Sequence, residues 1–216
     1  MNIKREEIKE LIRLNVQGAD RPGVTAALSK VLAEHNVDIL DIGQATIHND
    51  LGLGILFGLS AKNDSSAVLK DLLFKGYELG LNVKFTPIPL DEYEDWVSHQ
   101  GKERNIITLI GRNLTGIHLS KVTSIISEQG LNIDKITRIS GRRHLSDDNN
   151  TVMSVIEFSV RGIPCDEDKL KKDFLQVSKD TGIDLAFQED NIYRRNRRLV
   201  CFDMDSTLIQ AEVIDE

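Results

Sequence analysis

The sequence is poor in cysteine, proline and aromatic residues. Its 216 residues include two cysteines, four prolines and one tryptophan, and aromatic side chains make up 5%. Cys165 and Cys201 match no metal-binding spacing, which fits a reducing cytoplasm, and we expect both to be small buried apolar side chains. With so few aromatic rings, Ile, Leu and Val must build the cores.

Long apolar runs and an excess of positive charge are also missing. No stretch approaches the roughly 20 apolar residues that span a bilayer, and the first residues lack an apolar signal region. The net charge of −7 argues against broad contact with nucleic acid, because phosphate binding needs clustered Lys and Arg. We therefore expect a cytoplasmic protein that binds neither nucleic acid nor a membrane.

Hydrophobic periodicity predicts the element order β-α-β-β-α-β over residues 8–86. Helical spacing of apolar residues begins at Val24 and returns between Asp64 and Gly80. Asn49-Asp50 is the expected hairpin turn, and prolines 87 and 89 are expected to end the last strand. Strands are predicted at residues 11–17, 37–47, 51–60 and 81–86. This order is the split βαβ arrangement, with two helices on one face of an antiparallel sheet.

The same order of elements returns over residues 105–188. The turn Gly111–Gly116 repeats Gly18–Gly23 at an offset of 93 residues. Gly130 falls on Asn36, and both residue types accept a positive φ after a helix. Residues 87–104 are predicted to be a linker, whose Trp96 is expected to anchor it to a domain surface rather than to stack on a ligand. Residues 189–198 are predicted to be a second, basic linker. The fold class is therefore α+β, with two ferredoxin-like domains.

A glycine-breaker loop between the first strand and the first helix of a βαββαβ unit resembles the ACT domain family. The resemblance covers residues 8–86 and 105–188, and the second loop departs from the family pattern because Thr115 replaces the proline found at Pro22. Members of this family bind small amino acids where paired ACT units meet. The resemblance therefore implies an amino-acid effector and a homodimer.

The chemistry of a free amino acid fits these loops. Its carboxylate needs N–H donors, which the start of a helix offers, and its ammonium needs an acceptor such as Asp20 or Asn113. Serine-binding ACT domains also use the residue that opens the second strand, here Asp38 or Asn132. The expected effector residues are Gly18, Asp20, Arg21, Pro22, Gly23, Asp38, Gly111, Asn113, Thr115, Gly116 and Asn132.

A simpler interpretation of the two loops stays open. Asp20 and Asn113 would then only cap the helices that follow them, as Asp and Asn commonly do. The glycines would serve only the turns.

The end of the sequence carries a different signal. The apolar run Leu199–Phe202 predicts a buried parallel strand, and Asp203-Met204-Asp205-Ser206-Thr207 follows it directly. In an open α/β sheet, ligands bind just beyond the carboxyl end of such a strand. A strand followed by DxDxT resembles the haloacid-dehalogenase-like (HAD-like) phosphotransferases, and the run as far as Glu212 resembles the phosphoserine phosphatase family. Residues 199–216 would then be the start of an incomplete, doubly wound HAD-like α/β domain, with Leu199–Phe202 as its first strand.

The second resemblance implies a mechanism for converting phosphoserine to serine. Asp203 is the nucleophile that forms an aspartyl-phosphate, and Asp205 is the acid that protonates the leaving serine hydroxyl and then the base that activates water. Mg²⁺ is held by Asp203 and by the backbone carbonyl of Asp205. Glu212 recognises the amino group of the substrate. The family's later motifs have no room in the nine residues after Thr207, so we expect a truncated chain that is inactive alone.

Two other functions compete with this interpretation. The chain could be a stand-alone regulator with tandem ACT domains, or it could belong to another HAD-like phosphatase. A pure sensor has no use for DxDST after a buried strand, which favours an enzyme. A purely structural interpretation of the motif also stays open. Residues 203–207 would then be a turn at the end of a strand, with Ser206 or Thr207 capping a helix, and Glu212 would be a solvated residue of that helix.

Overall fold

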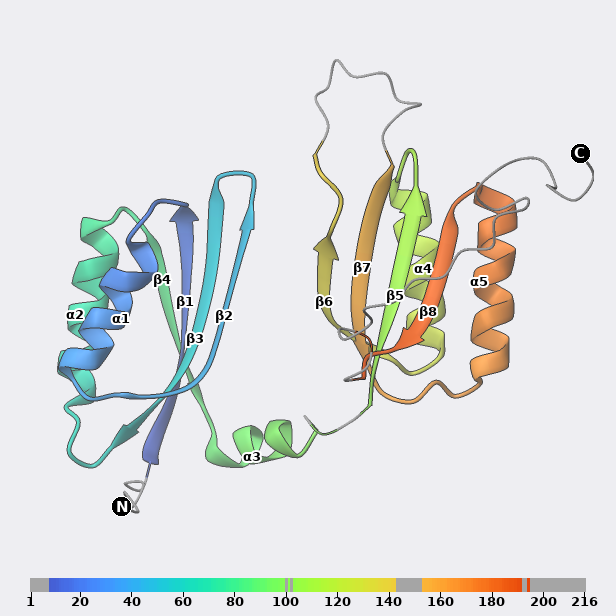
Figure 1. The fold of residues 1–216 in the computed structure, drawn as a ribbon. Coiled ribbons are helices and arrows are strands. Elements are labelled where there is room, and N and C mark those ends of the chain that lie inside the picture. Colours follow the sequence, from blue (N-terminus) through green and yellow to red (C-terminus); the bar gives the residue numbers. More distant parts are fainter. Residues whose placement is uncertain (1–7, 100, 102, 143–152, 192–193, 195–216) are drawn as a thin grey trace, which may run out of the picture. The chain divides into compact units, whose positions relative to one another are not determined.

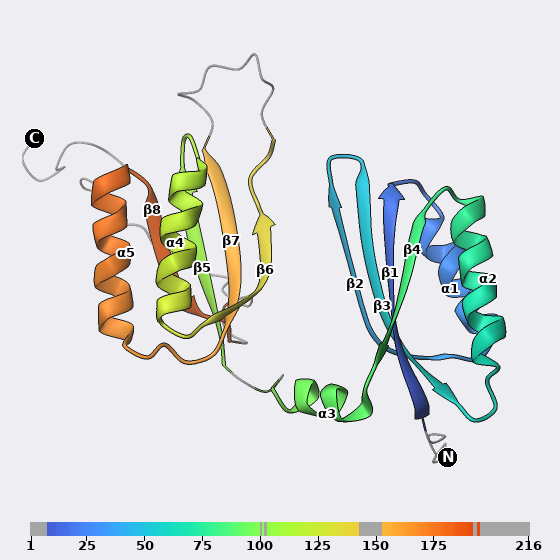
Figure 2. The same ribbon diagram turned by 180° about the vertical axis from the view of Figure 1, so that it is seen from behind.

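The computed structural model describes residues 8–99, 101, 103–142, 153–191 and 194. The chain divides into two compact units, residues 1–100 and 101–216. Each unit has a four-stranded antiparallel sheet with two helices packed on one face, as Figures 1 and 2 show from opposite sides. The predicted α+β class with two ferredoxin-like units is therefore confirmed. The strand expected at residues 199–202 lies outside the described residues.

The first unit contains six elements in the predicted order and one further helix. They are β1 (Ile8–Ala19), α1 (Val24–Glu34), β2 (Asp38–Ile47), β3 (Asp50–Ser60), α2 (Ser65–Glu78), β4 (Asn82–Ile88) and α3 (Leu90–Ser98). The strand order is β2-β3-β1-β4, so β1 and β3 are central and β2 and β4 are the edges. The Asp64 carboxylate caps α2 by accepting a hydrogen bond from the Ala67 N–H at 3.2 Å.

The second unit repeats this topology. Its elements are β5 (Arg104–Gly111), α4 (Gly116–Glu128), β6 (Asn132–Arg138), β7 (Ser154–Arg161), α5 (Glu167–Thr181) and β8 (Asp184–Glu189), and its strand order is β6-β7-β5-β8. Asn36 has a φ of 51° and Gly130 a φ of 70°, so both first helices are followed by a left-handed residue, as the sequence predicted. None of the helices built from described residues is long and apolar enough to cross a membrane.

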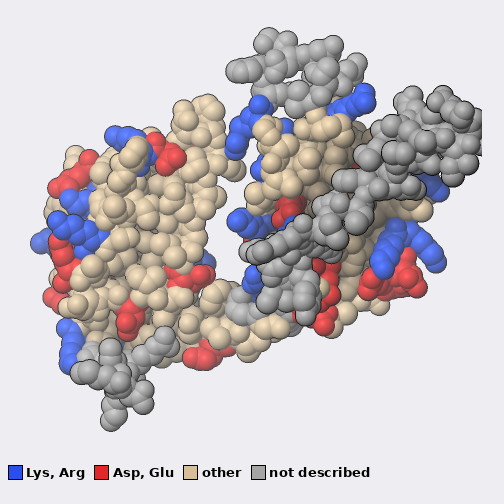
Figure 3. Space-filling view, in the orientation of Figure 1, with Lys and Arg blue, Asp and Glu red and all other residues tan. Residues whose placement is uncertain are grey.

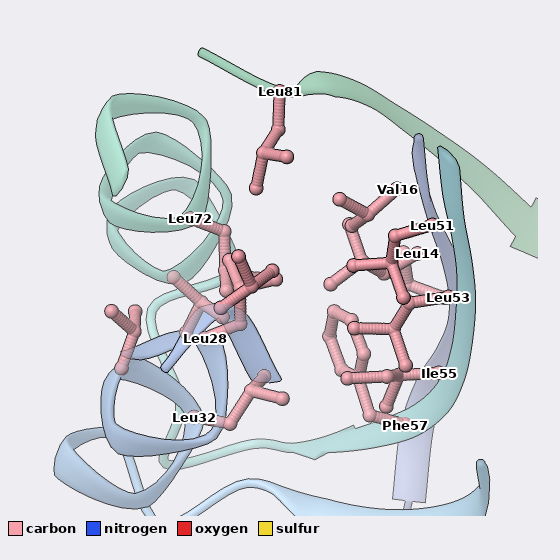
Figure 4. Close-up of a cluster of buried hydrophobic side chains, with 14 of the residues drawn as sticks. Leu14, Val16, Leu28, Leu32, Leu51, Leu53, Ile55, Phe57, Leu72 and Leu81 are labelled. Carbon is pink, nitrogen blue, oxygen red and sulfur yellow. The ribbon is translucent and has the colours of Figure 1, made fainter. Parts of the chain in front are cut away.

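The core of the first unit lies between its helices and its sheet. Along β3, large apolar side chains alternate with glycines, and Figure 4 shows Leu51, Leu53, Ile55 and Phe57 pointing toward the helices. Leu28 of α1 and other aliphatic side chains of both helices meet them from the opposite side. Glycines 52, 54 and 58 fall on the far face of β3, so this face carries little side-chain material.

Two predicted strand boundaries are wrong. The hairpin turn between β2 and β3 is His48-Asn49, with His48 at a φ of 58°, and Asp50 already belongs to β3. Pro87 does not end the fourth strand but lies within β4, paired with Ile12. Because β4 is an edge strand, a residue without an N–H is tolerated there.

One helix was not predicted, and one expectation about a cysteine is wrong. The segment predicted to be a linker contains the helix α3, whose first turn carries Asp91 and Glu92. Acidic side chains at that position favour a helix, because they face the positive end of its dipole. Cys165, expected to be buried, is exposed, and Cys201 lies outside the described part of the chain.

Two adjacent leucines of α2 test the position of this core. Leu72 is fully buried, whereas Leu73 is 55% exposed. We expect Leu72→Ala to lower the free energy of unfolding of the first unit by about 2 to 5 kcal/mol, because it leaves a cavity in the core. Leu73→Ala removes the same atoms from the surface and should cost less than about 1 kcal/mol. Chemical denaturation followed by Trp96 fluorescence measures both, and equal losses would contradict the described packing.

Candidate functional site

The loop between β1 and α1 lines an open pocket of about 350 Å³. Four of the predicted effector residues meet there, namely Asp20, Arg21, Pro22 and Gly23. The first turn of α1 and Gln44 of β2 complete the lining. Gly18 lies at the end of β1 and does not line this pocket; a Cβ there would come within 2.8 Å of Leu81 Cδ2.

Hydrogen bonds fix this loop to its surroundings. The Arg21 guanidinium donates to the carbonyl of Leu79, at the end of α2, at 2.9 Å. The Asp20 N–H donates to the carbonyl of Asn49 at 2.8 Å, and the hydroxyl of Thr46 donates to the Asp20 carboxylate at 3.4 Å. The loop is therefore held between the β2–β3 hairpin and the second helix.

The Asp20 carboxylate does not cap α1, although the simpler interpretation of the sequence expected it to. The N-cap residue is Gly23, with a φ of 93°, and no side chain accepts a hydrogen bond from the first turn. Pro22 also precedes the helix, which begins at Val24. The Val24 N–H donates to the Arg21 carbonyl at 3.4 Å, and no side chain of the N-cap residue accepts from the N–H groups that follow. N–H groups at the start of a helix are donors of the kind that bind a carboxylate.

Two polar residues of this site, Thr25 and Gln44, were not among the predicted effector residues. The Thr25 hydroxyl donates to the Gln44 side-chain carbonyl at 2.7 Å, so the two side chains form one wall. Gln44 is paired with Leu53 of β3, and Thr46 is paired with Leu51. Because both leucines point toward the helices, Gln44 and Thr46 lie on the helix-facing side of β2. In the sequence, Gln44 could have been noticed because it is a polar residue at a position of β2 where the alternation of the strand calls for an apolar one.

The corresponding loop of the second unit differs in charge. It lines a pocket of about 210 Å³ that includes Asn113, three arginines (112, 138 and 142) and no carboxylate. Thr115, rather than the expected Asn113, is the N-cap residue of α4. Its N–H donates to His118 Nδ1 at 3.0 Å. The first loop therefore offers both signs of charge, and the second offers positive charge.

The structure does not bring Asp38 or Asn132 to the loop of its own unit. Asp38 is paired with Gly58 of β3, whereas Gly18 is paired with Leu51, seven residues away. Seven residues of an antiparallel strand span about 24 Å. Asn132 is separated from the loop of the second unit in the same way along β7.

The other predicted site residues cannot be placed. Asp203, Asp205 and Glu212 lie outside the described residues. In the part of the chain that the structure describes, no group of three His, Cys, Asp or Glu side chains is arranged to hold a metal ion.

Comparison with known proteins agrees with the fold. The ACT domain family matches residues 10–86 and again residues 104–188. This chain belongs to the ACT domain family. A UPF0237 protein of Pyrobaculum aerophilum is 38% identical over 85 residues, which are 39% of this chain and 94% of that protein. A crystal structure of a protein from Galdieria sulphuraria superposes with a TM-score of 0.64 at 15% identity, covering 84% of this chain and 99% of that one, which shows the shared fold alone.

This ACT-domain chain also resembles longer proteins that are named phosphoserine phosphatases. Phosphoserine phosphatase SerB2 of Mycobacterium tuberculosis is 30% identical over 208 residues, which are 96% of this chain and 47% of that protein. Phosphoserine phosphatase of Streptomyces coelicolor is 29% identical over 202 residues, which are 94% of this chain and 45% of that protein. The chain therefore spans about half the length of these two relatives.

The two ACT loops supply a matched test of the conformation of the first. Gly23 has a φ of 93° with open space around it, whereas Gly116, its counterpart, has no positive φ and equally open space. We expect Gly23→Ala to destabilise the protein by about 1 to 2 kcal/mol, because a side chain disfavours this left-handed conformation. Gly116→Ala should change the stability by less than about 0.5 kcal/mol. Calorimetric unfolding of both variants checks this, and an equal response would contradict the difference between the loops.

Proposed function

We propose that this chain is the regulatory part of a phosphoserine phosphatase and that its first ACT domain senses L-serine, the product of that enzyme. The observation that carries the proposal is the match to SerB2 of Mycobacterium tuberculosis. Because it covers 96% of this chain, it includes Asp203 and Asp205 as well as both ACT domains. The phosphatase chemistry itself is proposed from the motif Asp203-Met204-Asp205-Ser206-Thr207 of the sequence.

The catalytic part of the proposal rests on the chemistry of the motif. Asp203 attacks the phosphorus of phosphoserine, and Asp205 protonates the leaving hydroxyl and then takes a proton from water. Glu212 holds the amino group of the substrate. The carboxylate of Asp203 and the main-chain carbonyl of Asp205 are hard oxygen donors of the kind Mg²⁺ prefers, and the ion would offset the charge between carboxylate and phosphate.

The first loop suits serine better than the second does. Serine needs donors for its carboxylate, an acceptor for its ammonium and a partner for its hydroxyl. The uncapped start of α1 supplies the donors, the Asp20 carboxylate supplies the acceptor, and Thr25 and Gln44 can bind the hydroxyl. The second loop lacks a carboxylate in its lining, which leaves an ammonium without a charged partner.

Exposed apolar side chains support a homodimer. Phe74 and Tyr77 of α2 are 59% and 83% exposed, and Ile42 on the edge strand β2 is 52% exposed. Unpaired edge strands and exposed apolar side chains favour association with a second copy. A second copy would also allow Asp38 of one chain to complete the site formed by the Asp20 loop of the other, which a single unit cannot do.

Calorimetric titration of the 216-residue chain with L-serine tests the sensor. We expect saturable heat at millimolar serine, an affinity at least about tenfold lower in Asp20→Ala, and a change of less than about twofold in Asn113→Ala. The two substitutions affect equivalent loops, so each controls for the other. Absence of heat and of thermal stabilisation, or equal loss of affinity in both variants, would contradict the proposal.

The catalytic assignment is tested in the protein expressed from its complete gene. Asp203→Asn should reduce Mg²⁺-dependent phosphate release from phosphoserine by at least about 10³-fold, because it removes the nucleophile. Asp215→Asn, twelve residues further along and outside the motif, should retain activity within about twofold. Full activity of the Asp203 variant would exclude the proposed role.

A further inference from the structure

The first unit has a second pocket, separate from the Asp20 loop, on the face of the sheet opposite α1 and α2. Its volume is about 380 Å³, within the range of roughly 300 to 1,000 Å³ that is common for small-molecule sites. Gly43 and Gly54 line its floor, and α3 lines the opposite side. Surface charge gathers mainly along the helical edge of this unit, and the visible surface over its strands is mostly uncharged (Figure 3).

The hollow exists because glycines replace side chains in the floor. A Cβ on Gly43 would meet nothing within 4 Å, and a Cβ on Gly54 would meet only two oxygen atoms at 3.9 Å. The space above these residues is therefore not required by the packing of the fold. Glycine in a strand interior weakens a sheet and often marks a place where a ligand approaches the backbone.

Three charged side chains line this pocket from three different elements. Arg13 comes from β1, Asp41 from β2 and Glu92 from α3. A bulge between Ile39 and Asp41 shifts the register of β2, so Asp41 faces this pocket instead of the helices. The Asp41 carboxylate is fixed by the N–H of Ile42 at 2.9 Å. Neither Arg13 nor Glu92 has an ion-pair partner among the described residues, so both can bind a ligand.

Two aromatic rings of α3 supply an apolar wall. The centroids of Tyr93 and Trp96 lie 5.9 Å apart with an angle of 38° between the ring planes. Trp96 is 40% exposed, so one part of the ring faces the pocket and another part faces solvent. Leu56 and Ile88 extend the apolar surface between the rings and the sheet.

The second unit does not repeat this pocket. Ile106 occupies the position of Arg13, as the offset of 93 residues and the strand pairing show, and it is 2% exposed. Glu157 occupies the position of Gly54 and forms an ion pair with Arg194. The same place in the shared fold is therefore filled in one copy and open in the other.

We infer that this pocket binds a free amino acid with a large apolar or aromatic side chain. Its carboxylate pairs with the Arg13 guanidinium, and its ammonium lies between the carboxylates of Asp41 and Glu92. Its side chain packs between the glycine floor and the rings of Tyr93 and Trp96. The site is distinct from the Asp20 loop and does not depend on the function proposed above.

Trp96 is the single tryptophan of the sequence, so its fluorescence reports on this pocket. Titration of the 216-residue chain with L-phenylalanine should give a saturable change in Trp96 emission. Gly54→Val fills the floor, and we expect it to weaken phenylalanine binding by about tenfold or more. Gly52→Val is the matched control, because Gly52 is on the same face of β3 but outside the pocket, and it should bind within about twofold of the natural protein.

A second pair of measurements separates binding of an amino acid from binding of any apolar ring. Arg13→Gln keeps the fold, because Arg13 is exposed, and should weaken phenylalanine binding about tenfold or more. Phenethylamine lacks the carboxylate and should bind equally weakly to the Arg13 variant and to the natural protein. No emission change with phenylalanine, or equal binding by the natural protein and the Gly54 and Arg13 variants, would overturn the inference.

Discussion

The alternation of large apolar side chains and glycines along β3 decides where a ligand can reach the first ACT domain. The apolar residues bind the two helices to one face of the sheet, and this contact orients the β1–α1 loop against α2. The glycines leave the other face with little side-chain material, and Gly43 and Gly54 line a pocket there together with residues of α3. A single strand thus supports a loop site on one side and a pocket on the other.

The two ACT domains share the same order of strands and helices but differ in the charged side chains of their loops and sheets. The first loop combines a carboxylate, a guanidinium and an uncapped helix start, whereas the second combines three arginines with a helix start held by Thr115 and His118. On the open face, Gly54 is replaced by Glu157, whose ion pair with Arg194 takes the place of a cavity. The two domains therefore both have apolar side chains in their cores and differ in the charged side chains of these two pockets.

The fold could be predicted from the sequence because packing leaves a periodic pattern. Breakers such as Asn36 and Gly130 marked the helix ends correctly, since positive φ favours particular residue types. The wrong predictions concern residues whose conformation or hydrogen bonding depends on tertiary contacts. Pro87 is tolerated only because β4 is an edge, and Asp20 is drawn away from α1 by Thr46 of β2. Gln44 left a signal, as a polar residue at an apolar position of its strand, whereas Arg13 could not be recognised as a site residue, because what it faces depends on strand pairing and on the position of α3.

Hydrogen exchange across the whole chain tests most directly the central claim that the first ACT domain carries the ligand sites. With L-serine, we expect slower exchange in the segment from Asp20 to Ala26, and with L-phenylalanine slower exchange in α3. Neither amino acid should protect the loop from Gly111 to Gly116. Protection confined to that second loop, or no protection by either amino acid at saturating concentration, would contradict the account.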